Sequence, residues 1–385
     1  MSVSPLTTTD PALAAAKLAE PRPPMLRPRP VDAARLAGAP WVARVLLAPM
    51  AEITCAPFRR LCRELGAGCA VTEMSKARYV VEPNEDTERT LFFTPAERPV
   101  GAQIVGADED EIRQAAERLA ARGFDFIDLN LGCSVRRIVF EGCGGALLTD
   151  PTLVERLVRA AREASGLPVT VKMRSGPKPL QVTAPEIARA AEAGGVAGIA
   201  IHPRFVSQGY GGSADPTIAT QVVQAVRVPV AVGGDVLSPQ IAVQLLRTTG
   251  AAAVQFGRGA IGRPWAIAET QSLIDLVDGT GFTPAYFTPA QKLTIAWRHL
   301  LGMAEHYGPP RAALMFRRHG VAYAAAVIEP DRRLAFEAGM KTLTSVDQAR
   351  PIFTAAGLPD DAPAFVPPTN PPPAGHRPPG QRATS

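Results

Sequence analysis

The chain has 385 residues, and its 41 lysine and arginine side chains against 36 aspartate and glutamate side chains give a formal net charge of +5. Hydrophobic residues make up 46% and charged residues 20%, which excludes a wholly disordered chain. The five cysteines form no CxxC pair, and neither a secretory signal nor a run of eighteen apolar residues occurs, which argues against a disulfide scaffold, a zinc finger and a membrane-spanning protein. We therefore expect a soluble cytoplasmic enzyme that holds no metal.

The two ends of the chain are rich in proline. Residues 1–40 combine proline with alanine, and residues 357–385 combine proline runs with few apolar side chains. Such a composition is typical of flexible or polyproline-like segments. We expect a flexible leader over 1–40 and a disordered tail over 357–385.

Between these ends, short apolar runs alternate with segments of helical spacing. Eight runs are predicted to be strands: Val45–Ala48, Ala70–Met74, Val100–Ile104, Phe126–Asn130, Val169–Met173, Gly198–His202, Val230–Val232 and Ala253–Phe256. Three helical segments begin with a capping residue followed by proline, at Asp150-Pro151, Asp215-Pro216 and Ser238-Pro239. Apolar strands alternating with amphipathic helices indicate a parallel sheet covered by helices. Eight such units favour an α/β fold of the closed (β/α)8 TIM barrel type over residues 41–288.

After Thr288 the strand pattern stops. Helical spacing over Gln291–Glu305, Ala312–Ile328 and Asp331–Ala338 predicts a small all-helical domain over residues 289–356. This segment carries 9 basic and 5 acidic side chains as well as three histidines, and such a surplus attracts polyanions. A solvated helical face is the competing interpretation of the same charges.

The active site of a β/α barrel lies at the carboxyl ends of its strands. Polar residues follow the apolar runs at those positions, among them Gln103, Asn130, Cys133, Lys172 and His202. The last two runs are followed by glycine-rich segments, Gly233-Gly234-Asp235 and Gly257-Arg258-Gly259. Bare backbone N–H groups at these places are typical of a phosphate site, although tight turns could also require the glycines.

Seven stretches carry a more specific signal. They are LAPMAEITCAPFRRLCRELGAG (Leu47 to Gly68), DLNLGCSVRRIV (Asp128 to Val139), GGALLTDP (Gly144 to Pro151), VTVKMRSG (Val169 to Gly176), IHPRFVSQGYGGSAD (Ile201 to Asp215), VGGDVLSP (Val232 to Pro239) and VQFGRGAIGRPW (Val254 to Trp265). In order and spacing they resemble the tRNA-dihydrouridine synthases, the bacterial B-type most closely, over roughly four-fifths of the chain. In the helical segment, MFRRHGVAY (Met315 to Tyr323) resembles a stretch of the family's helical domain.

The resemblance implies an FMN-dependent barrel that reduces uridines of tRNA to 5,6-dihydrouridine with NADPH, and it implies that Cys133 is the catalytic acid. The implied flavin-binding residues are Pro49, Met50 and Ala51 behind the isoalloxazine, Gln103 and Lys172 at its pyrimidine side, His202 at its face, and Gly233, Gly234, Asp235, Gly257 and Arg258 at the ribityl phosphate. The implied substrate-binding residues are Asn130 at the base and Arg136, Arg137, Arg204, Arg317 and Arg318 along the RNA. The implied partners are tRNA and NADPH, and we expect a monomer without a membrane partner.

The chemistry of the reaction is consistent with these roles. Hydride addition to carbon-6 of uracil leaves enolate-like charge, and carbon-5 then needs a proton. A cysteine thiol with an ordinary pKa of about 8.5 stays mostly protonated at neutral pH and can supply that proton. A lysine ammonium group stabilises an anionic reduced flavin. A base that leaves its stack needs a pocket and also a surface that binds the RNA backbone.

Structural interpretations compete for several residues. The remaining cysteines, which are Cys55, Cys62, Cys69 and Cys143, show no ligand spacing and are expected to pack in the core. His202 could be a core histidine, and Arg136 with Arg137 could form a solvated turn.

Four positions depart from the family pattern. Ser134 stands where proline is usual, Gly233 where asparagine is usual, Pro203 where glycine is usual and Val206 where arginine is usual. These changes affect the cofactor site and part of the RNA contact. Two other functions stay open. One is an FMN barrel acting on a free dihydropyrimidine or dihydroorotate, which would need no basic helical domain. The other is a non-catalytic RNA-binding descendant, to which the changes at Ser134 and Gly233 point.

Overall fold

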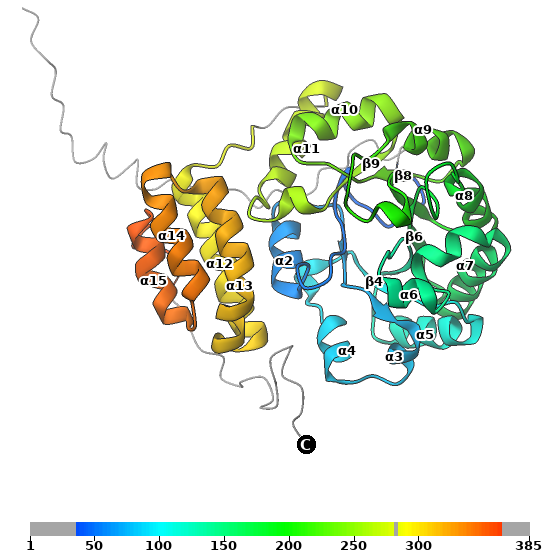
Figure 1. Cartoon of the computed structure of the whole chain (residues 1–385), viewed down its shortest axis with the longest axis horizontal. Coiled ribbons are helices and arrows are strands. Elements are labelled where there is room, and N and C mark those ends of the chain that lie inside the picture. The colour runs from blue at the N-terminus through cyan, green and yellow to red at the C-terminus, as the bar shows by residue number, and fades with distance from the viewer. Residues whose placement is uncertain (1–35, 281–283, 364–385) are drawn as a thin grey trace, which may run out of the picture.

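The structure is a computed structural model that describes residues 36–280 and 284–363. Figure 1 shows two parts side by side, a barrel of strands surrounded by helices and a bundle of helices next to it. Most of the predicted leader and of the predicted tail lies outside the described residues.

The strands of the described chain form one parallel sheet that curls into a barrel. They are β1 (Val45–Leu47), β2 (Ala70–Val71), β3 (Ser75–Lys76), β4 (Val100–Val105), β5 (Phe126–Leu131), β6 (Val169–Arg174), β7 (Gly198–His202), β8 (Val230–Val232) and β9 (Ala253–Phe256). Their order is β1-β9-β8-β7-β6-β5-β4-β2, and β3 also pairs with β4. Next to β1, the Gly68 N–H donates to the Val45 carbonyl at 2.7 Å and the Val42 N–H donates to the Gly68 carbonyl at 3.0 Å. These bonds nearly close the barrel, so the predicted architecture is confirmed.

The second predicted strand, Ala70–Met74, is broken into two pieces in the structure. Ala70 of β2 pairs with Val100, and Ser75 of β3 pairs with Ile104, so the first side has one residue more than the second. An extra residue on one side interrupts a strand ladder. The apolar run gave no sign of this interruption, because a bulge leaves the composition unchanged.

The two faces of the strands have different surroundings. Outward-facing side chains such as Val171, Ile199 and Val254 join the large apolar cluster that the helices complete. Inward-facing strand side chains form a smaller apolar layer together with Leu36, Trp41 and Cys69, which lie outside the strands. The strand members are Leu46, Val71, Phe126, Ala200, Ala231 and Ala253. The next inward positions toward the carboxyl ends are polar: Asp128, Asn130, Thr170, Lys172 and His202. Because side chains alternate between the two faces of a strand, the barrel interior has this apolar layer, the apolar floor of the barrel, below a polar layer at the carboxyl ends of the strands.

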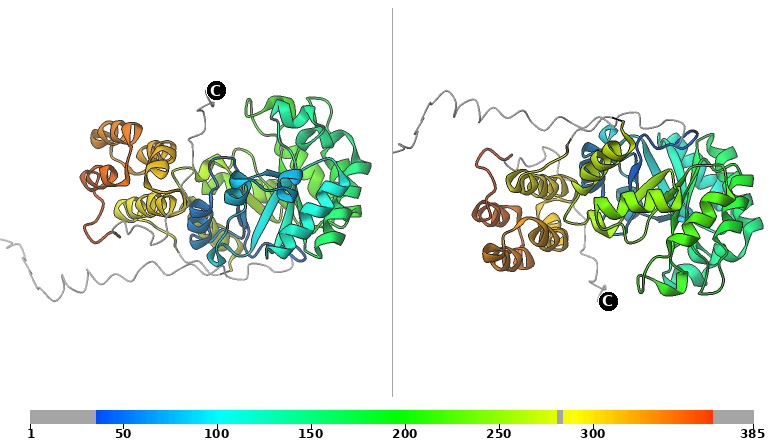
Figure 2. Two further views of the ribbon diagram at one scale, coloured as in Figure 1. Left: turned by 90° about the horizontal axis from the view of Figure 1, so that it is seen from below. Right: turned by 90° about the horizontal axis from the view of Figure 1, so that it is seen from above.

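Helices cover the outside of the barrel in all three views (Figures 1 and 2). They are α2 (Ala56–Glu64), α3 (Ala77–Val81), α4 (Glu85–Thr90), α5 (Glu109–Ala121), α6 (Arg136–Phe140), α7 (Pro151–Ser165), α8 (Ala184–Ala193), α9 (Pro216–Ala225), α10 (Pro239–Thr249) and α11 (Ala266–Asp278). The three predicted caps are confirmed, because the side chains of Asp150, Asp215 and Ser238 each accept a backbone N–H of the first turn of α7, α9 and α10.

The helical C-terminal region contains α12 (Pro289–Tyr307), α13 (Pro309–Val327), α14 (Pro330–Thr342) and α15 (Val346–Ala355). The first three correspond to the predicted helices. The sequence does not predict α15, because Pro351 inside it breaks the helical pattern. The region packs on the barrel where the Phe58 ring of α2 lies 5.0 Å from the His299 ring and 5.6 Å from the His319 ring.

Packing continues beyond the predicted boundaries at both ends of the described chain. Leu36 is buried in the apolar floor of the barrel. The Pro363 carbonyl accepts the Trp297 indole N–H at 2.6 Å. Separately, no helix within 36–280 or 284–363 combines the length and the apolar character that crossing a bilayer requires.

Candidate active site

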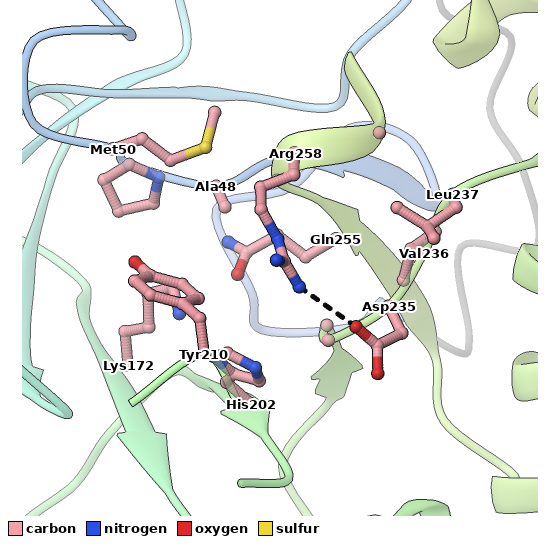
Figure 3. Close-up of a pocket in the computed structure, with 15 residues that line it drawn as sticks. Ala48, Met50, Lys172, His202, Tyr210, Asp235, Val236, Leu237, Gln255 and Arg258 are labelled. Atoms are coloured by element: carbon pink, nitrogen blue, oxygen red, sulfur yellow. Dashed lines mark hydrogen bonds and ion pairs between the residues drawn. The ribbon is translucent and has the colours of Figure 1, made fainter. Parts of the chain in front are cut away.

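A cavity opens at the carboxyl ends of five neighbouring strands, β6 to β9 and β1 (Figure 3). Its lining residues are Ala48, Pro49, Met50, Lys172, His202, Tyr210, Gly233, Gly234, Asp235, Val236, Leu237, Gln255, Gly257, Arg258 and Gly259. All the predicted flavin-binding residues except Ala51 and Gln103 line this one cavity. Residues that are far apart in sequence therefore meet at one rim.

Two glycine-rich loops form one wall of the cavity. A Cβ at Gly257 would lie 3.7 Å from the Met50 sulfur, and a Cβ at Gly233 would lie 3.7 Å from the Gln255 side-chain oxygen. The bare backbone therefore leaves open a cradle that side chains would fill. Gly234 has a φ of +86°, and a Cβ there would lie 2.7 Å from the His202 ring, so this position requires glycine.

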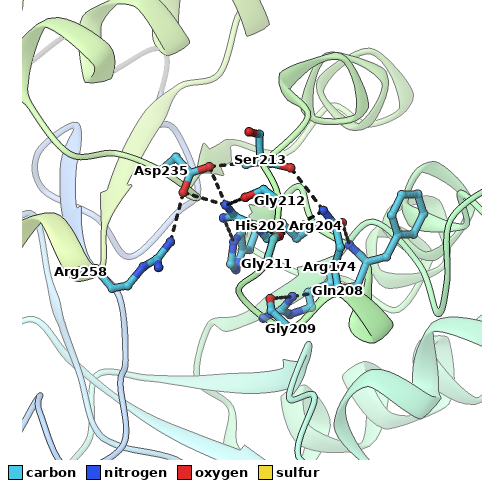
Figure 4. A network of polar contacts seen from close by, with 12 residues as sticks. Arg174, His202, Arg204, Gln208, Gly209, Gly211, Gly212, Ser213, Asp235 and Arg258 are labelled. Atoms are coloured by element: carbon cyan, nitrogen blue, oxygen red, sulfur yellow. Dashed lines mark hydrogen bonds and ion pairs between the residues drawn. The ribbon is translucent and has the colours of Figure 1, made fainter.

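Asp235 organises two arginines beside the glycine loops (Figure 4). Its carboxylate accepts Arg204 Nη2 at 2.9 and 2.7 Å, Arg258 Nη2 at 3.1 Å and the Ala214 N–H at 2.9 Å. Partial burial alone would raise the pKa of this carboxyl group, but the Ala214 hydrogen bond and the two guanidinium groups lower it. Asp235 therefore stays ionised and holds Arg258 at the edge of the cavity.

Arg204 lies inside the protein, which corrects the prediction that it contacts RNA. Its side chain is 2% exposed. Besides Asp235, it donates to the Gly211 carbonyl at 3.2 Å and to the Gly212 carbonyl at 2.7 Å. The guanidinium group is thus occupied by the loop that follows β7, and it supports that loop from within.

We expect Arg204→Ala to lower the free energy of unfolding by roughly 2–4 kcal/mol, because it leaves the Asp235 carboxylate without its buried partner. Urea unfolding followed by circular dichroism measures this loss. Arg258→Ala is the matched control, since Arg258 is bound to the same carboxylate but is about half exposed, and it should cost less than about 1 kcal/mol. Equal losses in the two variants would contradict a buried supporting role.

Lys172 projects from β6 into the cavity and is half-buried. Burial lowers the pKa of its ammonium group to about 8, the Arg174 charge lowers it as well, and the Asp128 carboxylate opposes both effects. Lys172 is therefore mostly protonated at neutral pH. Asp128 is the anionic partner that a buried lysine needs, and sequence reasoning did not identify it.

His202 is neutral in this site. Burial, and then the charges of Lys172, Arg174 and Arg204, lower its pKa to about 2. The Arg204 Nη1 atom lies 3.1 Å from His202 Nε2. A guanidinium group can only donate, so Nε2 accepts and the ring proton is on Nδ1.

Cys133 lies in the loop after β5, at the same rim as Lys172, because Asn130 of β5 is the register partner of Lys172. The Asn130 side-chain oxygen accepts the N–H groups of Gly132 at 3.0 Å and of Cys133 at 2.8 Å. On the other side, the Cys133 carbonyl accepts the Gly145 N–H at 3.0 Å. Cys133 itself is half-exposed beside the cavity and is not among its lining residues.

Gln103 lies deeper than the cavity wall and is 2% exposed. Its Nε2 donates to Asp128 at 2.6 Å, and its Oε1 accepts the Asn130 amide at 2.9 Å. Each end of the amide thus holds one protein partner, and each keeps one further hydrogen-bonding position, so the predicted role at the flavin edge stays a prediction. Ala51 is exposed next to Met50.

The remaining arginines predicted to contact RNA lie on two surfaces. Arg136 and Arg137 are exposed on α6, next to the Cys133 loop. Arg318 is exposed on α13 and lies 3.2 Å from Glu52 of the barrel, whereas Arg317 donates to the Leu343 carbonyl at 2.9 Å. A groove separates α13 from the barrel, and its lining residues are Glu52, Cys55, Arg59, Glu73, Asp86, Arg89, Thr90, Tyr307, Arg311, Leu314, Met315, Arg317 and Arg318.

Two histidines of the helical region do not add to its positive surface. His299 and His319 are buried, and their rings lie 4.6 Å apart. Burial lowers the pKa of His319 to about 4 and that of His299 well below the usual range. Both are neutral packing residues at the contact with the barrel.

Tyr210 is a cavity residue that sequence reasoning missed. Its ring is 64% exposed and lies 5.6 Å from the Arg174 guanidinium and 5.3 Å from that of Arg258. Such cation–π contacts hold the ring across the mouth of the cavity. Tyr210 lies within the stretch Ile201 to Asp215, which is one of the seven that resemble the family, so that stretch could have pointed to it.

The structure also gives the surroundings of several single residues. Cys55, Cys62 and Cys69 are buried, as packing residues should be. Val206, which stands where arginine is usual, packs on Gly145, since a Cβ at Gly145 would lie 2.6 Å from it. Gly145 in turn donates its N–H to the Cys133 carbonyl. The described residues contain no group of three His, Cys, Asp or Glu side chains placed to hold a metal ion.

The barrel, together with a lysine, a neutral histidine and open glycine loops around one cavity at the carboxyl ends of its strands, defines a β/α-barrel enzyme. The family model described as dihydrouridine synthase (Dus) matches residues 46–352. The chain therefore belongs to the dihydrouridine synthase family.

Individual relatives agree with this assignment. The chain is 36% identical over 276 residues to tRNA-dihydrouridine synthase B of Xanthomonas axonopodis pv. citri (strain 306), covering 72% of this chain and 82% of that protein. It is 35% identical over 275 residues to tRNA-dihydrouridine synthase B of Yersinia pestis, covering 71% and 84%. Among solved structures, a 2-naphthoyl-CoA reductase complex has a TM-score of 0.46 at 10% identity and covers 62% of this chain and 50% of that one.

Proposed function

We propose that this chain is a flavin-dependent oxidoreductase that reduces uridines of tRNA to 5,6-dihydrouridine, with FMN in the cavity and NADPH as reductant. The observation that carries the proposal is the convergence of Lys172, His202 and both glycine loops on one cavity beside the Cys133 loop. The names of the similar proteins support the tRNA substrate. We also propose that the protein acts as a cytoplasmic monomer.

The cavity residues fit FMN. The bare backbone at Gly233 and Gly257 offers a cradle, and Arg258 offers a guanidinium group to a phosphate. Pro49 and Met50 form an apolar wall that suits one face of a flat ring. When bound, FMN would supply the hydride that carbon-6 of uracil receives.

The protein's own groups would then complete the reaction. Lys172 places a positive charge in the cavity at neutral pH. The neutral His202 offers its Nδ1 proton as a hydrogen-bond donor. Cys133 holds the proton that carbon-5 of uracil needs, on a loop that Asn130 fixes through two backbone N–H groups.

The groove between α13 and the barrel is the proposed path of the RNA. Its lining carries more arginines than carboxylates, and Arg318 is exposed at its edge. On the other side of the Cys133 loop, the exposed Arg136 offers a second contact to phosphate.

We expect Arg318→Ala and Arg136→Ala each to weaken tRNA binding and to reduce the slope of log K against log salt concentration by about one, because each arginine neutralises a phosphate. Filter binding across a salt series measures both quantities. Arg332→Ala on α14 is the control, since this exposed arginine lies outside the groove, and it should leave the slope unchanged. A wild-type slope in Arg318→Ala would refute the path through the groove, and a wild-type slope in Arg136→Ala would refute the second contact.

Dihydrouridine mapping of tRNA from a deletion strain, with and without a plasmid-borne copy, tests the proposed function. We expect specific dihydrouridines to disappear and to return with the copy. Unchanged tRNA, together with turnover of a free dihydropyrimidine or dihydroorotate by the flavin-loaded protein, would establish the small-molecule alternative. A purified protein without flavin would favour the non-catalytic one.

A further inference from the structure

A chain of side-chain hydrogen bonds crosses the barrel interior beneath the Cys133 loop. Thr170 Oγ1 donates to Asp128 Oδ1 at 2.6 Å, and Gln103 Nε2 donates to Asp128 Oδ2 at 2.6 Å. Asn130 Nδ2 donates to Gln103 Oε1 at 2.9 Å, and Asn130 Oδ1 accepts the Cys133 N–H at 2.8 Å. These hydrogen bonds thus run from β6 to β5, across to β4 and back to Asn130 of β5, which holds the loop.

The direction of this chain is set by Asp128. An amide can present either its oxygen or its nitrogen to a neighbour, whereas an ionised carboxylate only accepts. Gln103 must therefore turn its nitrogen toward Asp128 and its oxygen toward Asn130. Asn130 must then turn its nitrogen toward Gln103, which leaves its oxygen to face the backbone of Gly132 and Cys133.

Asp128 also acts on Lys172. Thr170 and Lys172 are two residues apart on β6, so both side chains face the interior where Asp128 lies. Burial raises the pKa of Asp128, while the hydrogen bonds from Thr170 and Gln103 and then the Lys172 charge favour its ionised form. The Asp128 carboxylate in turn opposes the lowering of the Lys172 pKa by burial. The other titratable and charged groups around Lys172 are Arg174 on β6, His202 on β7, and Tyr210, Asp235 and Arg258 across the cavity.

We propose that Asp128 is a positioning residue, which orients the loop that carries Cys133 and supplies the counter-charge of Lys172. It is 4% exposed and does not line the cavity, so it acts through the residues that it holds. The part that concerns Lys172 rests on the proposed function. The part that concerns the loop is a property of the protein alone.

Four variants separate the two effects. Asp128→Asn removes the charge but keeps the chain, because its oxygen can accept from Gln103 while its nitrogen donates to the Thr170 hydroxyl. Gln103→Leu breaks the chain and keeps the charge. Asp128→Ala removes both. Thr170→Val is the matched control, since it removes one bond to Asp128 and leaves both the charge and the path to Cys133.

Hydrogen exchange at the amides of Gly132 and Cys133 tests the loop effect without cofactor or substrate. We expect exchange about fivefold faster in Gln103→Leu and Asp128→Ala, because the Asn130 oxygen loses its fixed orientation. Asp128→Asn and Thr170→Val should exchange like the wild type. Wild-type exchange in Gln103→Leu would overturn this part of the proposal.

The pH dependence of uridine reduction by the flavin-loaded protein tests the charge effect. We expect the rate of Asp128→Asn to fall at a pH about one unit below that of the wild type, because Lys172 loses its proton earlier. Gln103→Leu should reduce uridine more slowly, but its rate should fall at the same alkaline pH as that of the wild type. In Thr170→Val the alkaline fall of the rate should also stay where it is in the wild type. If the rate falls at the same alkaline pH in Asp128→Asn and in the wild type, Asp128 is not the counter-charge of Lys172.

The outcomes distinguish this inference from the proposed function. A wild-type protein that forms no dihydrouridine would refute the proposed function, while hydrogen exchange would still decide the loop effect. Near-UV circular dichroism checks the fold of each variant. If Asp128→Ala does not fold, Gln103→Leu and Asp128→Asn still test the two effects separately.

Discussion

Replacing Cys133 with alanine should reduce the rate of uridine reduction by about 10²- to 10⁴-fold, the usual contribution of a positioned general acid. The bound flavin and its reduction by NADPH should stay close to those of the wild type, because the thiol is needed only for the proton that carbon-5 receives. The loop should keep its shape. Its contacts to Asn130 and Gly145 use the backbone N–H and carbonyl of residue 133, which alanine retains.

Single-turnover mixing of the reduced enzyme with unmodified tRNA measures this effect, with dihydrouridine quantified by mass spectrometry. Cys143→Ala is a matched control, because Cys143 follows the same loop and is also half-exposed, and its thiol lies 3.5 Å from a backbone carbonyl. It should give the wild-type rate. A normal single-turnover yield from Cys133→Ala would remove the acid assignment.

Much of the barrel was predictable because its strands carry apolar side chains on both faces and therefore appear in the sequence as short apolar runs. Outward positions such as Val171 and Ile199 are apolar because they meet helices, and the runs that contain them mark the strands. Lys172 and His202 stand out as polar residues at the ends of such runs. All strands of a β/α barrel end at the same rim, so the residues that follow the apolar runs are expected to meet there. Most of the residues that line the cavity could be predicted in this way.

What the sequence could not show depends on pairing between distant strands. Asp128 sits inside an apolar run, and its partners Gln103 and Thr170 become visible only when β4, β5 and β6 are in register. Arg204 was expected to contact RNA because the resemblance to the family implied it. It is buried because Asp235, which lies after the next strand, supplies the neutralising charge.

Lys172→Met should slow flavin reduction or weaken flavin retention by about 10- to 100-fold, because it removes a preorganised positive charge from the cavity. The pH profile gives the sharper test. With a pKa of about 8, the ammonium group is present well below that pH and is lost as the pH rises through it. The wild-type rate should therefore fall above about pH 8. Lys172→Met should lack this limb, and Lys172→Arg should keep its charge beyond it.

Stopped-flow reduction by NADPH from pH 6 to pH 10, together with flavin content by absorbance, measures both effects. Lys341→Met is the control, since this lysine is exposed on α14 and pairs with Glu337 outside the cavity, and it should leave content, rate and pH limb unchanged. The methionine at position 172 keeps the apolar stem of lysine, so a changed rate reports the charge and not the packing. Unchanged flavin content and an unchanged alkaline limb in Lys172→Met would mean that the ammonium group does not face the cofactor, and Arg258 would then be the remaining cation of the cavity wall.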